Sequence, residues 1–256
     1  MSQIFKPIPR GYFDVSVLED NIENIKKEYN DNYEDYKNAM NLQEDSITMG
    51  EAFIKNRRGE LPTNPLKSYK VTEDTSPSGT PGYDLSTGYE NTWIAYNNEF
   101  YTLAEKYFPN TCTILNNIGN VFFAAFASMK PGGKIAVHKG KKRGKMKRSQ
   151  WCFISPTSKD CYISASKTLN NNGDSDAIFY YTENCSFQFE DTKYWHWVEN
   201  NTDEERVVLM IDYWENKKDI KKFDNYIYYL TESNDEGGFK SFQENKGNGD
   251  IHNESN

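Results

Sequence analysis

The chain has 256 residues and a formal net charge of −8, with 30 basic and 38 acidic side chains. This length predicts one domain with embellishments, and the acidic balance argues against a general nucleic-acid-binding protein. No run of about 18 apolar residues is present, so we expect no membrane-spanning helix, and the N-terminus lacks the apolar core of a secretion signal.

The four cysteines show no Cys-x-x-Cys spacing, which argues against a zinc site or a disulfide framework. Free thiols are typical of a reducing compartment. With no expected span or secretion signal, this pattern predicts a cytoplasmic protein. The cysteines are Cys112, Cys152, Cys161 and Cys185.

The first part of the chain is expected to form helices and a long loop. A serine-to-glutamate capping box precedes apolar residues at helical spacing, which predicts a helix over 16–30. Residues 41–90 are rich in Gly, Pro, Ser, Thr and charge, which predicts a loop that is either a functional lid or a surface excursion. Apolar residues over 100–107 mark a second helix. We therefore expect residues 1–118 to form a helical and loop cap packed on the core.

From residue 119 the pattern changes to short apolar segments separated by turn-forming clusters. Their number and spacing predict an all-β core over 119–234, of the jelly-roll (double-stranded β-helix, cupin-like) type. Apolar residues at helical spacing predict a short C-terminal helix over 220–230, and composition predicts a disordered tail over 235–256. The expected strands are 121–129, 134–137, 150–155, 161–166, 177–181, 186–189 and 206–213.

Two of the three histidines fall within this expected core, whereas His252 lies in the polar tail. His138 and His196 come from separate segments, and Arg206 begins a later apolar run. Two imidazoles and a nearby arginine suit an iron site with a carboxylate-bearing cosubstrate. Without their flanking residues, the histidines would more often be structural polar residues on a jelly-roll rim than metal ligands.

Arg206 is followed by apolar residues, which places it on a core strand where an unpaired arginine would be costly. A bound carboxylate would remove that cost, because the guanidinium group pairs with it through two parallel hydrogen bonds. The alternative is an arginine at the start of a strand, paired at the surface with Glu204 or Glu205.

The residues around these positions resemble the aspartyl/asparaginyl β-hydroxylase family of iron(II)- and 2-oxoglutarate-dependent oxygenases. The family motif P-G-x-x-I-x-x-H-x-G corresponds to residues 131–140. The motif F-D-D-S/T-x-x-H corresponds to residues 189–196, with one extra residue before the histidine, and R-x-x-L-x-x-D corresponds to 206–212. With weaker similarities upstream, the resemblance extends from about residue 12 to residue 214.

The resemblance implies that His138 and His196 bind iron(II) and that Arg206 binds the distal carboxylate of 2-oxoglutarate. Many iron oxygenases carry an acid ligand two residues after the first histidine. Here Gly140 stands at that place, as a glycine does in this family, and a water is expected to fill the gap. The implied reaction hydroxylates an unactivated C–H bond and converts 2-oxoglutarate and dioxygen to succinate and carbon dioxide.

Other positions match the family less closely. Arg148 matches a family arginine expected to help bind the cosubstrate, but Gln150 replaces the family's histidine and has no positive state. Ala127 replaces a serine beside the cosubstrate, and the adjacent Ser128 would face the other side of its strand. Trp93 stands where the family has a pocket tryptophan, although core packing is an equally good interpretation. These changes leave open a divergent or a degraded enzyme.

Further features flank the expected site. Asp191 and Thr192 are expected to brace the turn that carries His196, without binding the metal. The basic run over 139–148 is either a solvated loop or a site border that attracts an acidic substrate. The insertion over 170–175 suggests no function.

The resemblance implies a dioxygenase that acts on an Asp or Asn side chain of a protein or peptide, and the basic run favours an acidic one. The alternatives are an acyl-chain or small-metabolite hydroxylase and a non-catalytic jelly-roll binding module. Gln150 and Ala127 favour these alternatives over a strict copy of the family. No specific nucleic-acid partner is expected, and the sequence does not predict an oligomeric state.

Overall fold

The computed structural model describes residues 4–8, 13–41, 46–48, 70–72, 87–96, 99–140, 146–168, 174–214 and 216. The predicted helix over 220–230, the tail over 235–256 and most of the 41–90 loop lie outside these described residues. The helices are α1 (Ser16–Glu19), α2 (Ile22–Asn41), α4 (Thr102–Tyr107) and α5 (Pro109–Ile118). The strands are β1 (Ser46–Thr48), β2 (Lys70–Thr72), β3 (Thr87–Tyr96), β4 (Glu99–Phe100), β5 (Val121–His138), β6 (Met146–Ile154), β7 (Cys161–Ser166), β8 (Ala177–Tyr180), β9 (Cys185–Gln188), β10 (Trp195–Asn200) and β11 (Arg206–Trp214).

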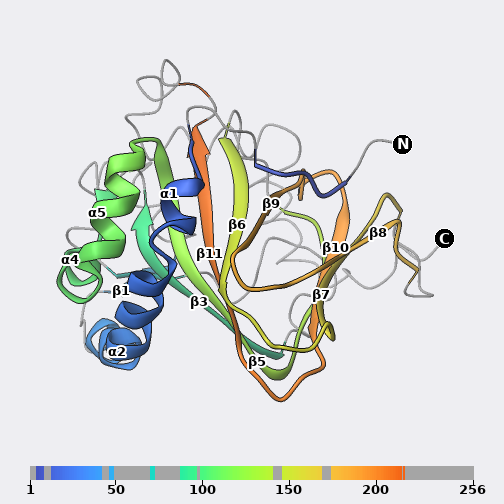
Figure 1. Cartoon of the computed structure of the whole chain (residues 1–256), viewed down its shortest axis with the longest axis horizontal. Helices are drawn as coiled ribbons and strands as arrows, with labels where there is room; N and C mark the ends of the chain where they lie inside the picture. The colour runs from blue at the N-terminus through green and yellow to red at the C-terminus, as the bar shows by residue number, and fades with distance from the viewer. Residues whose placement is uncertain are drawn as a thin grey trace.

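A nine-stranded antiparallel sheet forms the core of the molecule. Its hydrogen-bonded order is β8-β7-β10-β5-β11-β6-β9, with β3 paired to both β5 and β4. Figure 1 shows the sheet curling, with β3, β5, β11 and β6 beside the helices and β10, β7 and β8 on the far side. The predicted jelly-roll core is thus confirmed. Because β3 precedes residue 119, the main sheet draws on both expected parts of the chain.

The predicted helix over 16–30 is wrong in its bounds, because the chain forms two helices there. Asn21 Nδ2 donates to Val17 O at 2.8 Å at the break between α1 and α2. The predicted capping box is also absent. Instead, Asp14 Oδ1 accepts hydrogen bonds from the Ser16 backbone N–H and hydroxyl, at 3.0 and 2.7 Å.

One face of α2 packs on the outer side of the sheet. Its apolar residues recur at helical spacing, which is what a helix needs to bury a single stripe. Tyr29 lies edge-on to Phe126 of β5 and Phe153 of β6, with ring centroids 5.1 and 5.4 Å apart. Tyr36 donates to the carbonyl of Trp93 on β3 at 2.6 Å. The buried stripe consists of Ile25, Tyr29, Tyr33, Tyr36 and Met40.

Strand β5 runs unbroken for 18 residues, which corrects the prediction of two strands separated by a turn at Pro131-Gly132-Gly133. The first part of β5 pairs with β3 and β11, and its last part pairs with β10. Gly132 has φ 69°, and a Cβ at Gly133 would lie 2.8 Å from Lys130 O. These two glycines allow the strand to change course without ending.

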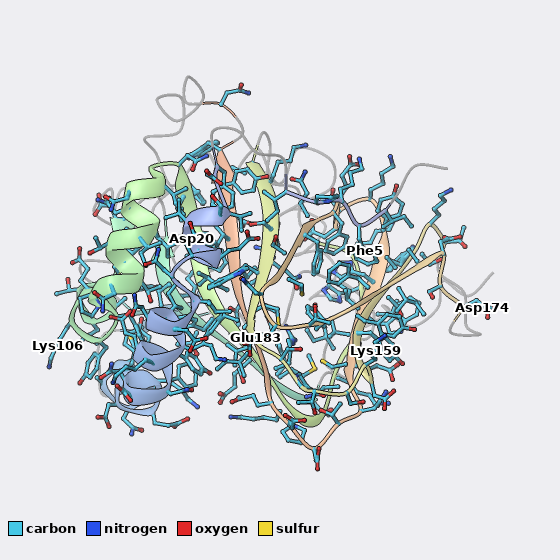
Figure 2. All side chains as sticks on the ribbon, in the orientation of Figure 1. Phe5, Asp20, Lys106, Lys159, Asp174 and Glu183 are labelled. Atoms are coloured by element: carbon cyan, nitrogen blue, oxygen red, sulfur yellow. The ribbon has the colours of Figure 1, made fainter. Side chains whose placement is uncertain are left out.

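The two edge strands, β8 and β9, meet through an aromatic cluster. Phe179 of β8 and Phe187 of β9 have ring centroids 4.3 Å apart. Phe5 lies within 6 Å of both rings and of Phe189, and Figure 2 shows it between β9 and β10. Lys6 and Gln188 exchange two backbone hydrogen bonds of 2.9 Å, so the N-terminal segment covers the β9 edge.

No helix among the described residues is both long enough and apolar enough to cross a membrane.

The buried carboxylate of Glu28 joins α2 to the first turn of α5. It accepts hydrogen bonds from the backbone N–H groups of Asn110 and Thr111, each at 2.8 Å, and from the Thr111 hydroxyl at 2.6 Å. We expect Glu28→Gln to lower the free energy of unfolding by about 1–3 kcal/mol, because an amide nitrogen would then face backbone donors. Urea denaturation would measure this loss. The exposed Glu34→Gln on the same helix serves as the control and should stay within about 0.5 kcal/mol of the parent. Equal losses would contradict the capping role.

Candidate active site

The two histidines face each other across a strand pair. His138 ends β5 and is the register partner of His196 on β10. Their ring centroids are 4.1 Å apart, with the rings inclined at 52°. Phe189 packs edge-on against His196 at 5.0 Å, and His196 is buried. The two imidazoles that the sequence singled out are therefore neighbours within one site.

Backbone carbonyls orient both rings through their Nδ1 atoms. His138 Nδ1 lies 2.8 Å from Ala136 O, and His196 Nδ1 lies 3.1 Å from Tyr194 O. A carbonyl oxygen only accepts hydrogen bonds, so Nδ1 carries the proton in each ring and Nε2 is the nitrogen that would coordinate a metal. Histidine ligands are commonly oriented in this way, so the pair fits a divalent transition metal.

Gly140 is required by the close approach of Asp191. Its backbone N–H donates to Asp191 O at 2.9 Å, and a Cβ at this position would come within 2.2 Å of Asp191 Oδ2. Any side chain at residue 140 would have to displace the buried Asp191 carboxylate, which disfavours an acid two residues after His138. Among the residues that the structure describes, no group of three or more His, Cys, Asp or Glu side chains is arranged to hold a metal.

Arg206 lies at the start of β11 and is almost fully buried, at 1% exposure. Its Nε and Nη2 atoms have no hydrogen-bond partner, and the guanidinium carbon lies 4.7 Å from the centre of the Tyr181 ring. The surface alternative is wrong, because Glu204 bonds to Thr157 and Glu205 to Ser128. A buried cation with two unmatched donor nitrogens is costly, and a bound anion would remove that cost.

Gln150 is linked to Arg206 through Tyr181. The Tyr181 hydroxyl donates to Gln150 Oε1 at 2.8 Å, while its ring covers the guanidinium group. Burial raises the pKa of Tyr181, so the phenol stays protonated and acts as the donor. Gln150 therefore helps to orient the ring that lies over Arg206.

Arg148 lies between two buried carboxylates. Its Nε and Nη2 atoms donate to Asp212 Oδ1 and Oδ2 at 2.7 and 2.8 Å, and its Nη1 lies 4.0 Å from Asp191 Oδ2. The guanidinium group also packs over the Phe123 ring, 5.6 Å from its centre. Arg148 thus ties β6 and β11 to the turn that precedes His196.

The remaining positions lie on the surrounding strands. Ala127 is the register partner of Val208, and the adjacent Ser128 bonds to Glu205 on the opposite face of β5. Trp93 is buried and packs edge-on against Phe123 at 5.1 Å, an arrangement that also suits core packing. Within the basic run, Lys139 Nζ lies 4.9 Å from the centre of the Trp195 ring. Residues 141–145 of the run, and 170–173 of the insertion, lie outside the described residues.

A family model for aspartyl/asparaginyl beta-hydroxylase matches residues 19–216, which is most of the chain. The chain belongs to this family. Membership in this hydroxylase family supports an oxygenase or hydroxylase as the class of activity. A search of curated proteins found no match.

Similar solved structures are distant from this hydroxylase-family chain. A Pseudomonas putida prolyl-4-hydroxylase matches over 84% of this chain and 94% of its own, at 10% identity and a TM-score of 0.39. The Drosophila melanogaster CENP-C cupin domain matches over 35% of this chain and only 55% of its own, at 11% identity and a TM-score of 0.25. A predicted oxalate decarboxylase from Thermotoga maritima matches over 40% and 72%, at 14% identity and a TM-score of 0.25. Similarities this weak do not indicate what the chain acts on.

Sequence reasoning missed two residues of the site. Asp212 closes the family's third motif, but nothing in the sequence indicated its pairing with Arg148. Tyr181 ends an expected strand and carries no motif signal. Its contact with Arg206 depends on how β8 and the turn after it are placed against β11, which is a property of the folded sheet.

The fit between Gly140 and Asp191 can be tested with a pair of variants. We expect Gly140→Ala to lower the free energy of unfolding by about 1–3 kcal/mol, because the new methyl group displaces a buried carboxylate. In an Asp191→Ala background the same change should cost less than about 0.5 kcal/mol, because the clashing atoms are gone. Denaturant unfolding of the four proteins gives the coupling, and an equal cost in both backgrounds would disprove the contact.

Proposed function

We propose that this chain is an iron(II)- and 2-oxoglutarate-dependent dioxygenase that hydroxylates an Asp or Asn side chain of a protein or peptide. The observation that carries the proposal is the buried Arg206 with unmatched Nε and Nη2 atoms, beginning a strand that pairs with the strand of His138. A carboxylate can accept two parallel hydrogen bonds from a guanidinium group, which makes a dicarboxylate cosubstrate a natural ligand here.

The histidine pair would hold the metal through Nε2 of His138 and of His196. Bound iron(II), 2-oxoglutarate and dioxygen would together supply the oxidation: one oxygen atom enters the substrate C–H bond, and the other enters succinate as carbon dioxide is released. The chain contributes the two neutral imidazoles, each oriented by a backbone carbonyl. With two protein ligands, the remaining coordination positions are available for cosubstrate, dioxygen and water.

The far end of the cosubstrate would bind to Arg206, with Tyr181 shielding one face of the guanidinium group from water. A bidentate contact is stronger in such a dry environment than at the surface. Gln150 would act through its hydrogen bond to Tyr181. Arg148 would maintain the turn before His196 through its contacts with Asp212 and Asp191. The family resemblance implies that it also helps to bind 2-oxoglutarate.

The substrate class is supported by the family and by local charge. Lys139 directly follows His138, which places a cation at the end of β5 next to the metal-binding pair. A cation there favours an acidic acceptor such as an Asp-containing peptide. Hydroxylation of an acyl chain or a small metabolite would be recognised by product mass in a substrate screen.

The activity can be measured as succinate release by anaerobically purified protein given iron(II), 2-oxoglutarate and air, with and without an Asp-rich peptide. We expect His196→Ala to reduce succinate release by about 100-fold or more, because one of only two protein ligands is lost. His252→Ala, the same substitution in the tail, is the control and should leave the rate unchanged. Release that survives in His196→Ala would overturn the assignment of the metal site.

Binding of 2-oxoglutarate is tested separately by calorimetry under nitrogen. We expect Arg206→Met to raise Kd at least about 30-fold, because a buried charge-assisted contact is worth 2 kcal/mol or more. The Kd of Arg206→Lys should fall between the values of the parent and of Arg206→Met, since lysine keeps the charge but cannot form the bidentate contact. The exposed Lys159→Met, labelled in Figure 2, is the matched control. No 2-oxoglutarate binding by the parent protein would favour the non-catalytic module.

A further inference from the structure

Three of the four cysteines lie close together on strands β6, β7 and β9, and two of them lie near the Arg206 side chain. Cys152 lies on β6, Cys161 begins β7 and Cys185 begins β9, and all are free thiols. The charge of Arg206 acts on both Cys152 and Cys161, which places these thiols in the environment of the guanidinium group. Nothing in the proposed dioxygenase chemistry uses them.

Cys152 and Cys185 are direct register partners in the antiparallel pair of β6 and β9. Opposed residues in such a pair have Cα atoms about 4.5–5.5 Å apart. A disulfide needs a Cα separation of about 4.4–6.8 Å, so the backbone already has the spacing that a disulfide requires.

The turn before β9 holds Cys185 over Cys152. Asn184, whose φ is 60°, donates its backbone N–H to Cys152 O at 2.8 Å, and its side-chain oxygen accepts from Trp151 Nε1 at 2.9 Å. The two bonds attach the turn to β6 at Cys152 and at the preceding Trp151. The thiol pair is therefore positioned by contacts that do not depend on the sulfur atoms.

The two thiols differ in reactivity in the way that a dithiol pair requires. Cys185 is partly exposed, and its sulfur accepts a hydrogen bond from the Thr182 backbone N–H at 3.4 Å. Hydrogen bonding from Cys152 is the main influence that lowers the pKa of Cys185 to about 7. Burial raises the pKa of Cys152, which therefore stays a thiol. One partner can react as a thiolate, and the other waits beside it.

We propose that Cys152 and Cys185 form an oxidisable dithiol, in which peroxide attacks Cys185 and Cys152 then closes a disulfide. The Cys185 thiolate takes one oxygen from hydrogen peroxide, giving a sulfenic acid and hydroxide. The Cys152 sulfur displaces that oxygen, which leaves as water with the Cys152 proton. The proton that Cys185 released on ionising neutralises the hydroxide. Two thiols and one hydrogen peroxide thus give one disulfide and two waters. The proposal does not rest on the function proposed above, because no metal or 2-oxoglutarate takes part.

The chain is well suited to a direct test by peptide mapping. Cleavage after Lys and Arg places the four cysteines on four peptides, covering 107–134, 149–159, 160–167 and 168–193. The full chain, kept in chelator to suppress metal-driven radicals, would be treated with hydrogen peroxide, alkylated in denaturant and digested without reductant. We expect one cross-linked species joining 149–159 to 168–193, which disappears on treatment with dithiothreitol.

Matched variants assign the chemistry to each sulfur. Cys185→Ser should abolish the cross-link, Cys152→Ser should leave a sulfenic acid that dimedone traps at Cys185, and Cys112→Ser should change neither. The rate of cross-linking should rise about tenfold from pH 6 to pH 8, because the thiolate fraction of a group with a pKa near 7 rises by that factor. Circular dichroism would confirm that each variant is folded.

Three results would overturn the proposal. The first is a folded protein whose four cysteines all remain alkylatable after peroxide. The second is a cross-link between 160–167 and 168–193, which would make Cys161 the partner. The third is over-oxidation of Cys185 to the sulfinic acid with no cross-link, which would mean that Cys152 cannot reach it.

Discussion

The bend of β5 at Gly132 and Gly133 is the constraint on which the candidate site depends. Before the bend β5 pairs with β11, where Arg206 is opposite Met129, and after the bend it pairs with β10, where His138 is opposite His196. A single strand therefore fixes the position of Arg206 relative to His138 and His196. If β5 ended at Gly132 and Gly133, as the sequence suggests, no single strand would fix the distance between Arg206 and the two histidines. Separate loops would then have to maintain it.

A charged network connects the core of the sheet to the turn before His196. Asp212 on β11 binds Arg148 on β6, and Arg148 approaches Asp191, which in turn packs against Gly140. Each buried carboxylate has a cation nearby, so the cost of burial is offset within the group. Because Gly140 follows His138 by two residues and Asp191 precedes His196 by five, this charged network contacts both segments that carry the histidines.

The sequence predicted the jelly-roll class and singled out two histidines that the structure places opposite each other, because motif chemistry and alternating strands are both local signals. It predicted β7 with the bounds that the structure has, and most other core strands to within a few residues. Strand β10 was missed from the strand pattern although it carries His196. Its sequence, Trp-His-Trp-Val-Glu-Asn, contains too many polar residues to form an apolar run.

What the sequence could not supply was pairing across strands. The contacts of Tyr181 with Arg206 and of Arg148 with Asp212 depend on register, and a shift of one residue would turn each side chain to the other face. The capping box was wrong for a related reason. Ser16 and Glu19 have the correct spacing, but Asp14 lies closer and accepts the Ser16 backbone N–H that Glu19 would have bound, while the Glu19 N–H donates to Val15 O.

The contact between Gly140 and Asp191 also bears on how such a site can evolve. A carboxylate at residue 140 would give the three-ligand arrangement common in iron oxygenases, yet its Cβ would occupy space already filled by Asp191. The acid and the glycine must therefore change together, and either change alone passes through a less stable protein. A single substitution toward the three-ligand arrangement therefore lowers stability before it adds a ligand. For this reason the two-histidine arrangement is hard to leave by single substitutions.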